Sequence, residues 1–117
     1  MGTSKSTEAE RKYTAGVSIF SGRPDPIWPI PEALGSKLEK LFGELETFDG
    51  PATSAPPLGY RGAFLRDDAG HEWSAYRGVV TFNAEARKDP NRAFERELLA
   101  SAPDGIIPPA LLTQEFD

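Results

Sequence analysis

Residues 58–82, LGYRGAFLRDDAGHEWSAYRGVVTF, decide the predicted fold because they have the pattern of a β-hairpin. Two runs rich in aromatic and aliphatic residues, Leu58–Arg66 and Glu72–Phe82, enclose the turn-forming segment Asp67–Gly70. Runs of this kind, separated by a short loop that contains glycine, are typical of paired antiparallel strands. The sequence therefore predicts an antiparallel sheet built around this hairpin.

The length of the hairpin loop determines which residues share a face. A four-residue loop pairs Phe64 with Trp73, and a two-residue loop at Ala69-Gly70 shifts that pairing by two residues. Because side chains alternate between faces, both registers predict the same set on one face. That set is Tyr60, Gly62, Phe64, Trp73, Ala75, Arg77 and Val79. We expect a groove on this face, with aromatic residues on both sides of a small-residue floor.

The segment before the hairpin predicts a further strand and then a helix. Residues 12–20 alternate, with Tyr13, Ala15, Val17 and Ile19 on one face. The proline-rich segment 21–26 ends this strand, and residues 27–31 continue extended because residues before proline avoid the helical region. From Glu32 to about Thr47 the apolar residues have helical spacing. They are Leu34, Leu38, Leu41, Phe42 and Leu45.

The segment after the hairpin predicts a second helix and an apolar end. Asp89 has the position of a helix N-cap and Pro90 that of the first helical residue, which opens a helix to about Ala102. Its polar residues are expected in solvent: Arg92, Glu95, Arg96 and Glu97. The apolar segment Ile106–Leu112 must be buried, either in the core of its own chain or against a second subunit.

These elements predict one α+β domain at residues 12–117, preceded by a polar segment, residues 1–11, that we expect to be disordered. The domain combines a small antiparallel sheet, made of the strand and the hairpin, with two amphipathic helices. A chain of 117 residues buries only about two-thirds of its surface and supports one modest core. We therefore expect an intertwined homodimer.

The composition excludes several classes of function. The chain has no cysteine and one histidine, which excludes thiolate metal sites, thiol nucleophiles and multi-histidine metal sites. Its formal net charge of −5 disfavours nucleic-acid binding. The predicted hairpin has a small group of arginines, Arg61, Arg66 and Arg77. This group is sufficient to bind one or two carboxylates. The sequence has neither an apolar run of 18 residues nor a signal sequence. We therefore expect no membrane association and a cytoplasmic location.

Two groups of residues are candidates for function. His71, near Asp67 and Asp68, is a candidate general base, and the alternative is an ordinary exposed loop histidine. The second group has the composition of a binding surface: Trp28, Tyr60, Phe64 and Trp73 with Arg23 and Arg77. The alternative for its aromatic members is burial in the core.

Three motifs resemble a family of small bacterial proteins. They are VSIFSGRPDPIW at Val17–Trp28, LGYRGAF at Leu58–Phe64 and IIPP at Ile106–Pro109. The characterised members are the lysinoalanine synthases of duramycin and cinnamycin biosynthesis. The resemblance spans most of the chain after residue 12, and Asp25 departs from it because many relatives have asparagine there.

The resemblance implies a dimeric α+β enzyme that acts on a dehydrated, thioether-cyclised lanthipeptide. Such an enzyme adds a peptide lysine to a dehydroalanine of the same peptide, and a hydroxylated aspartate of the peptide accepts the lysine proton. No cofactor or metal is implied. No protein residue is firmly assigned to catalysis, and His71 is only a candidate. The expected peptide-binding residues are Phe20, Arg23, Asp25, Trp28, Tyr60, Phe64, Trp73 and Arg77.

Two further hypotheses remain open on the sequence alone. The same surface suits a module that binds a peptide or protein without catalysis. A small hydrolase or isomerase that uses His71 is the third possibility.

Overall fold

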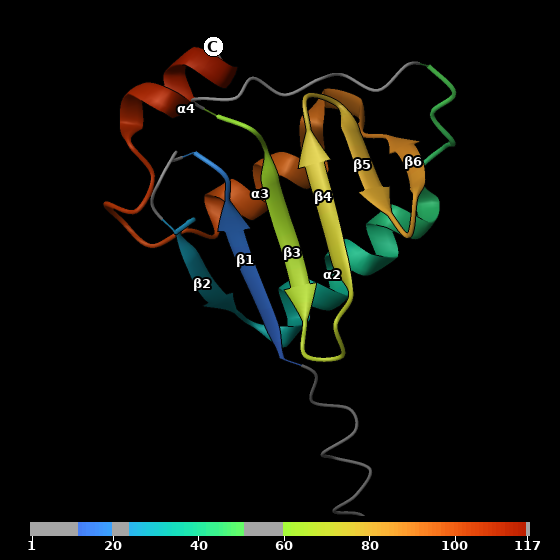
Figure 1. The fold of residues 1–117 in the computed structure, drawn as a ribbon, viewed down its shortest axis with the longest axis horizontal. Coiled ribbons are helices and arrows are strands. Elements are labelled where there is room, and N and C mark those ends of the chain that lie inside the picture. Colours follow the sequence, from blue (N-terminus) through green and yellow to red (C-terminus); the bar gives the residue numbers. More distant parts are fainter. Residues whose placement is uncertain (1–11, 20–23, 51–59, 117) are drawn as a thin grey trace, which may run out of the picture.

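A computed structural model of the protein describes residues 12–19, 24–50 and 60–116. These residues form an antiparallel six-stranded sheet with the strand order β2-β1-β3-β4-β5-β6, joined by helices (Figure 1). The strands are β1 (Tyr13–Val17), β2 (Ile27–Ile30), β3 (Ala63–Asp67), β4 (Glu72–Tyr76), β5 (Val79–Phe82) and β6 (Glu85–Lys88). The helices are α2 (Glu32–Glu44), the 3-10 helix η1 (Pro90–Arg92), α3 (Ala93–Ala100) and α4 (Pro109–Phe116). The predicted α+β class is confirmed, with a larger sheet than expected.

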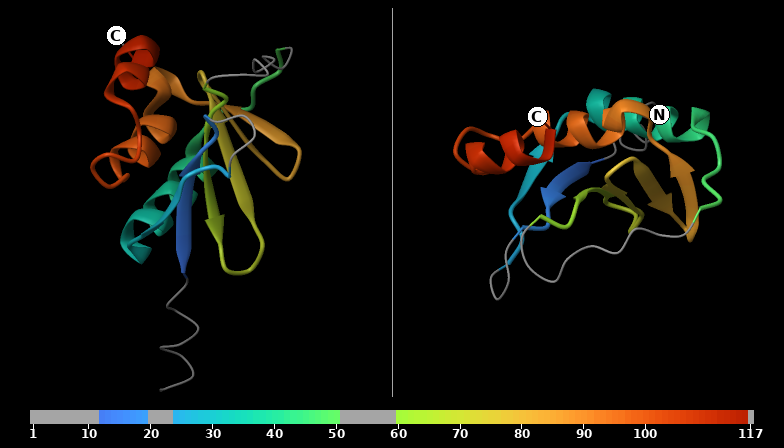
Figure 2. Two further views of the ribbon diagram at one scale, coloured as in Figure 1. Left: turned by 60° about the vertical axis from the view of Figure 1, so that its left-hand side comes forward. Right: turned by 90° about the horizontal axis from the view of Figure 1, so that it is seen from above.

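The helices lie on one face of the curved sheet, and the core fills the space between the two layers (Figure 2). The fully buried side chains of the core include Leu38, Leu65, Val80, Phe94 and Leu98. Among the described residues, no helix lies on the opposite face, which we call the open face. An antiparallel sheet tolerates this arrangement because alternate side chains point to the core and to the other side.

The predicted faces of β1 and α2 are confirmed. Tyr13, Ala15, Val17 and Ile19 are all buried, as the alternation indicated. The extended segment that follows forms the edge strand β2, in which Trp28 is paired with Ala15.

Helix α2 ends at Glu44, before the expected position. It buries Leu38 and Phe42 and packs closely on β1 at Gly35. A Cβ atom at this glycine would lie only 2.2 Å from the ring of Tyr13. The glycine therefore allows the helix to approach the sheet.

The register predicted for the hairpin is wrong. Leu65 is paired with Trp73, and Phe64 with Ser74, so Phe64 and Trp73 lie on opposite faces of the sheet. The reason is a three-residue loop, Asp68–Gly70, between Asp67 and His71, whose backbones are hydrogen bonded. Gly70 has a φ of +94°, as the last residue of such a loop requires.

The predicted strand at Glu72–Phe82 is also wrong, because it is divided into β4 and β5 by a tight turn. The turn residues Arg77 and Gly78 have φ values of 44° and 93°, the sign that two-residue hairpin turns favour. A second turn at Asn83-Ala84, with φ values of 52° and 65°, leads into β6, a strand that the sequence patterns did not indicate.

The start of the second predicted helix differs from the expectation. Pro90 opens only η1, and the chain passes through the left-handed residues Asn91 and Arg92 before α3 begins at Ala93. The carboxylate of Asp89 caps α3 although Asp89 is not the residue next to the helix. It accepts hydrogen bonds from the amides of Phe94 (2.9 Å) and Glu95 (3.2 Å).

The C-terminal apolar segment packs on the core of its own chain. Ile107 is buried, and Ile106, Leu111 and Leu112 are half-buried against the core cluster. The predicted disorder of residues 1–11 lies outside the described residues. Within the described part of the chain, no helix has the length and apolar character needed to cross a membrane.

Candidate functional site

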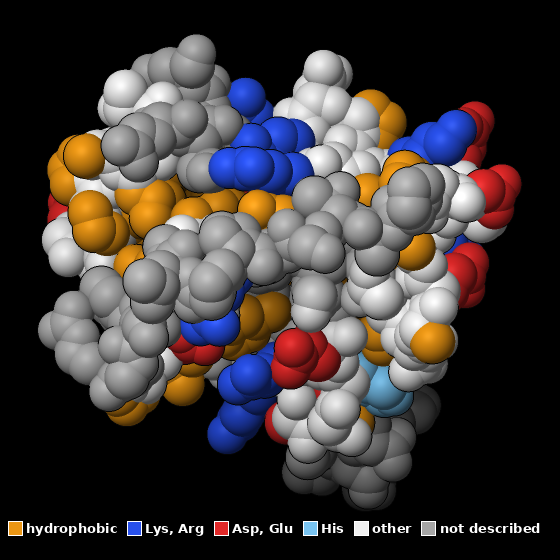
Figure 3. Space-filling view, turned by 45° about the horizontal axis from the view of Figure 1, so that its top comes forward, with side chains coloured by type: hydrophobic (Ala, Val, Ile, Leu, Met, Phe, Trp, Pro, Cys, Tyr) orange, Lys and Arg blue, Asp and Glu red, His pale blue; other side chains and the backbone are white. Residues whose placement is uncertain are grey.

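The open face of the sheet carries a hollow of about 180 Å³ near the end of β1, which we call the charged hollow. Cationic, acidic and hydrophobic side chains gather together on this side of the molecule (Figure 3). The lining includes Ser18, Asp25, Arg61, Phe64, Arg66, Glu72, Ser74 and Tyr76. Phe64 and Arg66 lie in β3, and Glu72, Ser74 and Tyr76 lie in β4. Ser18, Asp25 and Arg61 lie in the segments next to β1, β2 and β3, so the sheet brings the lining together.

A β-bulge places Arg61 in the lining. Arg61 and Gly62 together stand opposite Ser18: the Arg61 amide donates to the Ser18 carbonyl (2.7 Å), and the Ser18 amide donates to the Gly62 carbonyl (2.9 Å). Gly62 has a φ of +116°, and a Cβ there would lie 2.7 Å from the carbonyl oxygen of Ala75. Bulges of this kind redirect side chains next to binding sites.

The aromatic residues of the lining are Phe64 and Tyr76, and the Phe64 ring lies across β1. A Cβ at Gly16 would be 2.2 Å from the Phe64 Cζ atom, so the glycine provides the space for the ring. The guanidinium of Arg66 stands over the same ring, 4.3 Å from its centroid. Phe64 is 6% exposed and therefore forms a rigid wall rather than a mobile flap.

The charged groups of the hollow have both signs. Asp25 is half-buried and accepts a hydrogen bond from the Ser18 hydroxyl (3.2 Å). Arg66 and Glu72 stand directly opposite each other and form an ion pair of 2.8 Å. Their side chains are 48% and 45% exposed, so this pair adds little to stability and its groups are accessible to a ligand. The hollow thus presents anionic and cationic groups within one small space.

A buried polar cluster supports the hollow from the helix side. Glu95 is fully buried, and the prediction that its side chain lies in solvent is wrong. Its carboxylate accepts hydrogen bonds from the Tyr60 hydroxyl, from the Arg77 amide (2.9 Å) and from the Arg92 guanidinium (2.8 and 2.9 Å). Because Tyr60 directly precedes Arg61, this cluster anchors the bulge.

Three of the predicted binding residues lie in the core. Trp28 is 2% exposed and donates from Nε1 to the Ser101 hydroxyl (2.9 Å). Trp73 is 4% exposed and stacks on Phe82, with a centroid distance of 4.5 Å and an interplanar angle of 8°. Tyr60, at 6% exposure, is the partner of Glu95. The expected aromatic face is therefore split between the core and the open face.

The remaining predicted binding residues have separate positions. Asp25 and Phe64 both line the charged hollow. Arg77 is exposed in the β4–β5 turn, with its guanidinium 5.3 Å from the centroid of the Tyr76 ring. Phe20 and Arg23 lie outside the described residues.

His71 does not belong to the lining of the charged hollow. Its Nδ1 lies 2.8 Å from the Asp67 carboxylate, whose side chain is fully buried. The same carboxylate accepts hydrogen bonds from the amides of Ala69 (3.0 Å) and His71 (2.9 Å). The His71 ring contacts Trp73 and Phe82, with centroid distances of 6.1 and 5.8 Å. These contacts give it a role in closing the hairpin loop.

The predicted binding residues do not include four residues that line the charged hollow: Ser18, Arg61, Glu72 and Tyr76. The clustering of Arg61 and Arg66 was the available signal, together with an alternative loop length. With a three-residue loop, alternation alone puts Phe64, Arg66, Glu72, Ser74 and Tyr76 on one face.

Within the described ranges, no three histidine, aspartate or glutamate side chains are grouped so that they could hold a metal ion. No family model matches the sequence, no curated protein matches it, and no solved structure matches the fold.

Proposed function

We propose that this protein binds a compact, dehydrated and thioether-cyclised peptide in the charged hollow and closes a lysinoalanine bridge within that peptide. The observation that carries the proposal is that two acidic residues, Asp25 and Glu72, line one hollow together with Arg61, Arg66 and the Phe64 ring. A peptide that brings a lysine ammonium and a carboxylate close together has complementary charges. The resemblance of the three sequence motifs to lysinoalanine synthases agrees with this choice.

The proposed reaction is an addition without loss of atoms. The lysine Nε forms a bond to the β-carbon of dehydroalanine, the carbon–carbon double bond becomes single, and a proton lost by nitrogen is replaced by one gained at the α-carbon. The lysine, with an ordinary pKa of about 10.4, needs deprotonation and alignment. Holding the two groups of one peptide in reactive geometry lowers such a barrier by up to about 7–11 kcal/mol.

The charged hollow suits these requirements. Asp25 receives the lysine ammonium and guides it, while the peptide's own hydroxylated aspartate accepts the proton. Negative charge develops on the dehydroalanine carbonyl oxygen during addition, and Arg61 or Arg66 is placed to stabilise it. Rigid walls such as Phe64 fix the peptide, which is the contribution that alignment requires.

The proposal includes a homodimer formed through the C-terminal segment. Support comes from a hollow of about 310 Å³ between α3 and α4, lined by apolar residues such as Leu99, Ile107 and Leu112. Sedimentation velocity at several protein concentrations tests this part: a single species of monomer mass at all concentrations would overturn it.

The decisive assay incubates the protein with a duramycin-type core peptide that is dehydrated, thioether-cyclised and hydroxylated but not yet bridged. Because the reaction does not change the peptide mass, a thiol is added afterwards to react with any remaining dehydroalanine. The proposal predicts that the peptide becomes resistant to the thiol only when the protein is present. Thiol addition that is equal with and without the protein would contradict catalysis.

Two variants separate the possible mechanisms. Asp25→Asn removes one charge-assisted contact and should slow bridge formation about 10- to 100-fold, and Asp68→Asn in the exposed hairpin loop is the matched control. His71→Ala should have only a modest effect. A hydrolase or isomerase that depends on His71 predicts the opposite order.

A non-catalytic peptide-binding module is the second candidate. The observation that favours it is that His71, the only histidine of the chain, lies outside the charged hollow. This candidate predicts that the peptide binds while the rate of thiol-resistant product remains that of the uncatalysed reaction.

A further inference from the structure

The Arg66 side chain is held on the open face by contacts with two neighbours. Its Nε atom donates a hydrogen bond to the Glu72 carboxylate (2.8 Å), and its guanidinium carbon lies 4.3 Å from the centroid of the Phe64 ring. Arg66 and Glu72 stand directly opposite each other on β3 and β4, and Phe64 lies on the same face of β3. The guanidinium is therefore oriented from one side by a carboxylate and from another by a ring.

Both neighbours of Arg66 are themselves held. Phe64 is 6% exposed and fills the space above Gly16, so its ring has a fixed position. The second carboxylate oxygen of Glu72 lies 3.4 Å from the Ser74 hydroxyl, at the distance of a long hydrogen bond. An arginine that is oriented before a ligand arrives loses less side-chain entropy on binding.

The outer end of the Arg66 guanidinium is available to a ligand. Among the residues that the structure describes, Glu72 is its hydrogen-bond partner, and that bond uses Nε alone. The side chain is 48% exposed, and its two terminal nitrogens, Nη1 and Nη2, keep their N–H groups for another acceptor. Two parallel N–H groups match the two oxygens of a carboxylate.

Arg61, the other cation of the charged hollow, differs from Arg66 in exposure. It is half-buried, and its Nε atom is shielded from solvent. Electrostatic interactions are stronger where solvent is excluded, so Arg61 suits the charge that develops during addition. Arg66, the more exposed of the two, suits a charge that the peptide already carries when it arrives.

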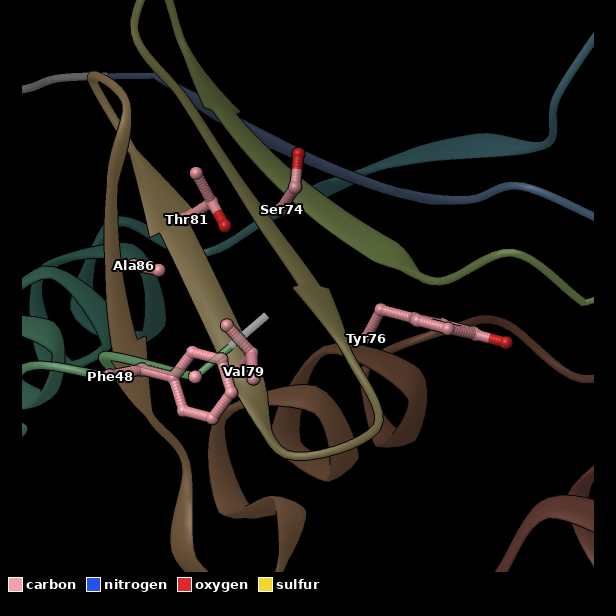
Figure 4. Close-up of a pocket in the computed structure, with 7 residues that line it drawn as sticks. Phe48, Ser74, Tyr76, Val79, Thr81 and Ala86 are labelled. Carbon is pink, nitrogen blue, oxygen red and sulfur yellow. The ribbon is translucent and has the colours of Figure 1, made fainter. Parts of the chain in front are cut away.

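The hollow next to the charged hollow offers a carboxylate no counter-charge. It has a volume of about 170 Å³, shares Ser74 and Tyr76 with the charged hollow, and is otherwise lined by uncharged residues such as Phe48, Val79 and Ala86 (Figure 4). A carboxylate there would lose hydration without gaining a cation. On this part of the open face, a peptide carboxylate therefore belongs in the charged hollow.

We propose that Arg66 is the receptor for a carboxylate of the bound peptide, which accepts hydrogen bonds from Nη1 and Nη2, and that Glu72 is the positioning residue that orients Arg66. This inference rests on the proposed function, because it deepens the same site. It divides the roles of the two arginines: Arg66 binds the peptide, and Arg61 stabilises the developing charge. The carboxylate comes from an acidic side chain or from the C-terminus of the peptide, since both are planar and form the same two hydrogen bonds.

The experiment measures peptide affinity by calorimetry with three probes. The parent probe is the cyclised, hydroxylated duramycin-type peptide in which alanine replaces the dehydroalanine, so that it binds without reacting. One derivative has a C-terminal amide, and the other has the amide in place of the carboxylate of the hydroxylated aspartate. One of the two derivatives should bind the wild type at least about 10-fold more weakly than the parent, which identifies the source of the carboxylate.

Arg66→Gln tests whether Arg66 is the receptor. It should weaken binding of the parent probe by a similar factor and abolish the difference between the parent and the weaker derivative, since a double-mutant cycle isolates the contact between the two groups. Arg96→Gln makes the same change at an exposed position of α3, on the helix side, and is the matched control. In this control the difference between the probes should be that of the wild type.

Two variants of Glu72 test the positioning role. Glu72→Gln and Glu72→Ala both remove the negative charge, but only glutamine keeps an oxygen that can accept the hydrogen bond from Arg66 Nε. The parent probe should therefore bind Glu72→Ala about 3- to 10-fold more weakly than Glu72→Gln. Because an exposed ion pair adds little to stability, both variants should unfold at nearly the wild-type temperature. Equal affinities of the two variants would overturn the positioning role.

The outcomes separate this inference from the proposed function. A difference between the parent and the weaker derivative that persists in Arg66→Gln overturns the inference and leaves the proposed function in place, as does a wild type that binds all three probes equally. A carboxylate contact that depends on Arg66, in a protein that closes no bridge, overturns the proposed reaction alone. A wild type that does not bind the parent probe overturns both.

Discussion

At the residue scale, the carboxyl group of Asp89 is the clearest case of an environment that changes acid–base behaviour. Burial raises its pKa above the ordinary 3.8 and is the largest influence. The amides of Phe94 and Glu95 lower the pKa, the Glu95 carboxylate raises it and the Arg92 guanidinium lowers it. The net effect is a raised pKa, so the folded protein holds this proton more tightly than the unfolded chain does.

This shift predicts a pH dependence of stability. Because the folded pKa is raised, the stabilisation from Asp89 protonation is complete below pH 3.8 and is lost as pH rises through the folded pKa. In Asp89→Asn this position no longer titrates, so the unfolding free energy of the wild type minus that of the variant should fall as pH rises.

Urea unfolding of both proteins between about pH 4 and pH 7 measures this difference. Asp104→Asn, at an exposed position, is the control and should show no comparable trend. A wild-type advantage that increases with pH would contradict the assignment.

At the scale of single elements, α2 contains two glycines that the structure distinguishes. Gly35 faces the Tyr13 ring at a distance that leaves no room for a Cβ, while a Cβ atom at Gly43 would lie in open space. Alanine is the better helix former by about 1 kcal/mol. Close packing, not helix propensity, therefore decides the outcome at Gly35.

The two alanine substitutions should have opposite effects on stability. Gly43→Ala should raise the unfolding free energy by about 0.5–1 kcal/mol. Gly35→Ala should lower it by about 1–3 kcal/mol, the usual cost of overpacking. Chemical denaturation of both variants measures the pair, and stabilisation by both would contradict the described contact between α2 and β1.

The same scale shows which elements the sequence could predict. The alternation of Tyr13, Ala15 and Val17 and the helical spacing of Leu38 and Phe42 reflect burial on one face, so periodicity identified them. The hairpin register depends on the length of the loop. A loop that is one residue longer or shorter moves every side chain of one strand to the opposite face of the sheet. Nothing in the apolar pattern distinguished a three-residue loop, so the register was assigned incorrectly.

The buried charge of Glu95 illustrates a second limit of prediction. In the sequence it stands among Arg92, Arg96 and Glu97, a pattern typical of a solvated helix face. Its burial depends on partners distant in sequence, Tyr60 and the Arg77 amide. Such a cluster becomes visible only when the hairpin and α3 are packed together.

At the scale of the whole molecule, the helices that the structure describes cover one face of the sheet, and the charged hollow lies on the other face. The charged hollow joins Ser18 and Asp25 from the first part of the chain to Arg61, Arg66 and Glu72 on the central hairpin. The predicted peptide-binding set includes Asp25 and Phe64, which both line the charged hollow, and also Trp28 and Trp73, which both belong to the core. Large aromatic residues occur both in protein cores and in binding sites, so their presence in a sequence does not distinguish the two.

The proposed function requires that the peptide binds on the open face of the sheet, at the charged hollow. Amide chemical-shift mapping locates the bound peptide, and a cyclised peptide in which alanine replaces the dehydroalanine binds without reacting. Binding at the charged hollow should shift the amide signals of Ser18, Arg66, Ser74 and Tyr76 and leave that of Ala69, in the hairpin loop, almost unchanged. Shifts confined to the helix side, such as those at Leu99 and Leu112 between α3 and α4, would contradict it.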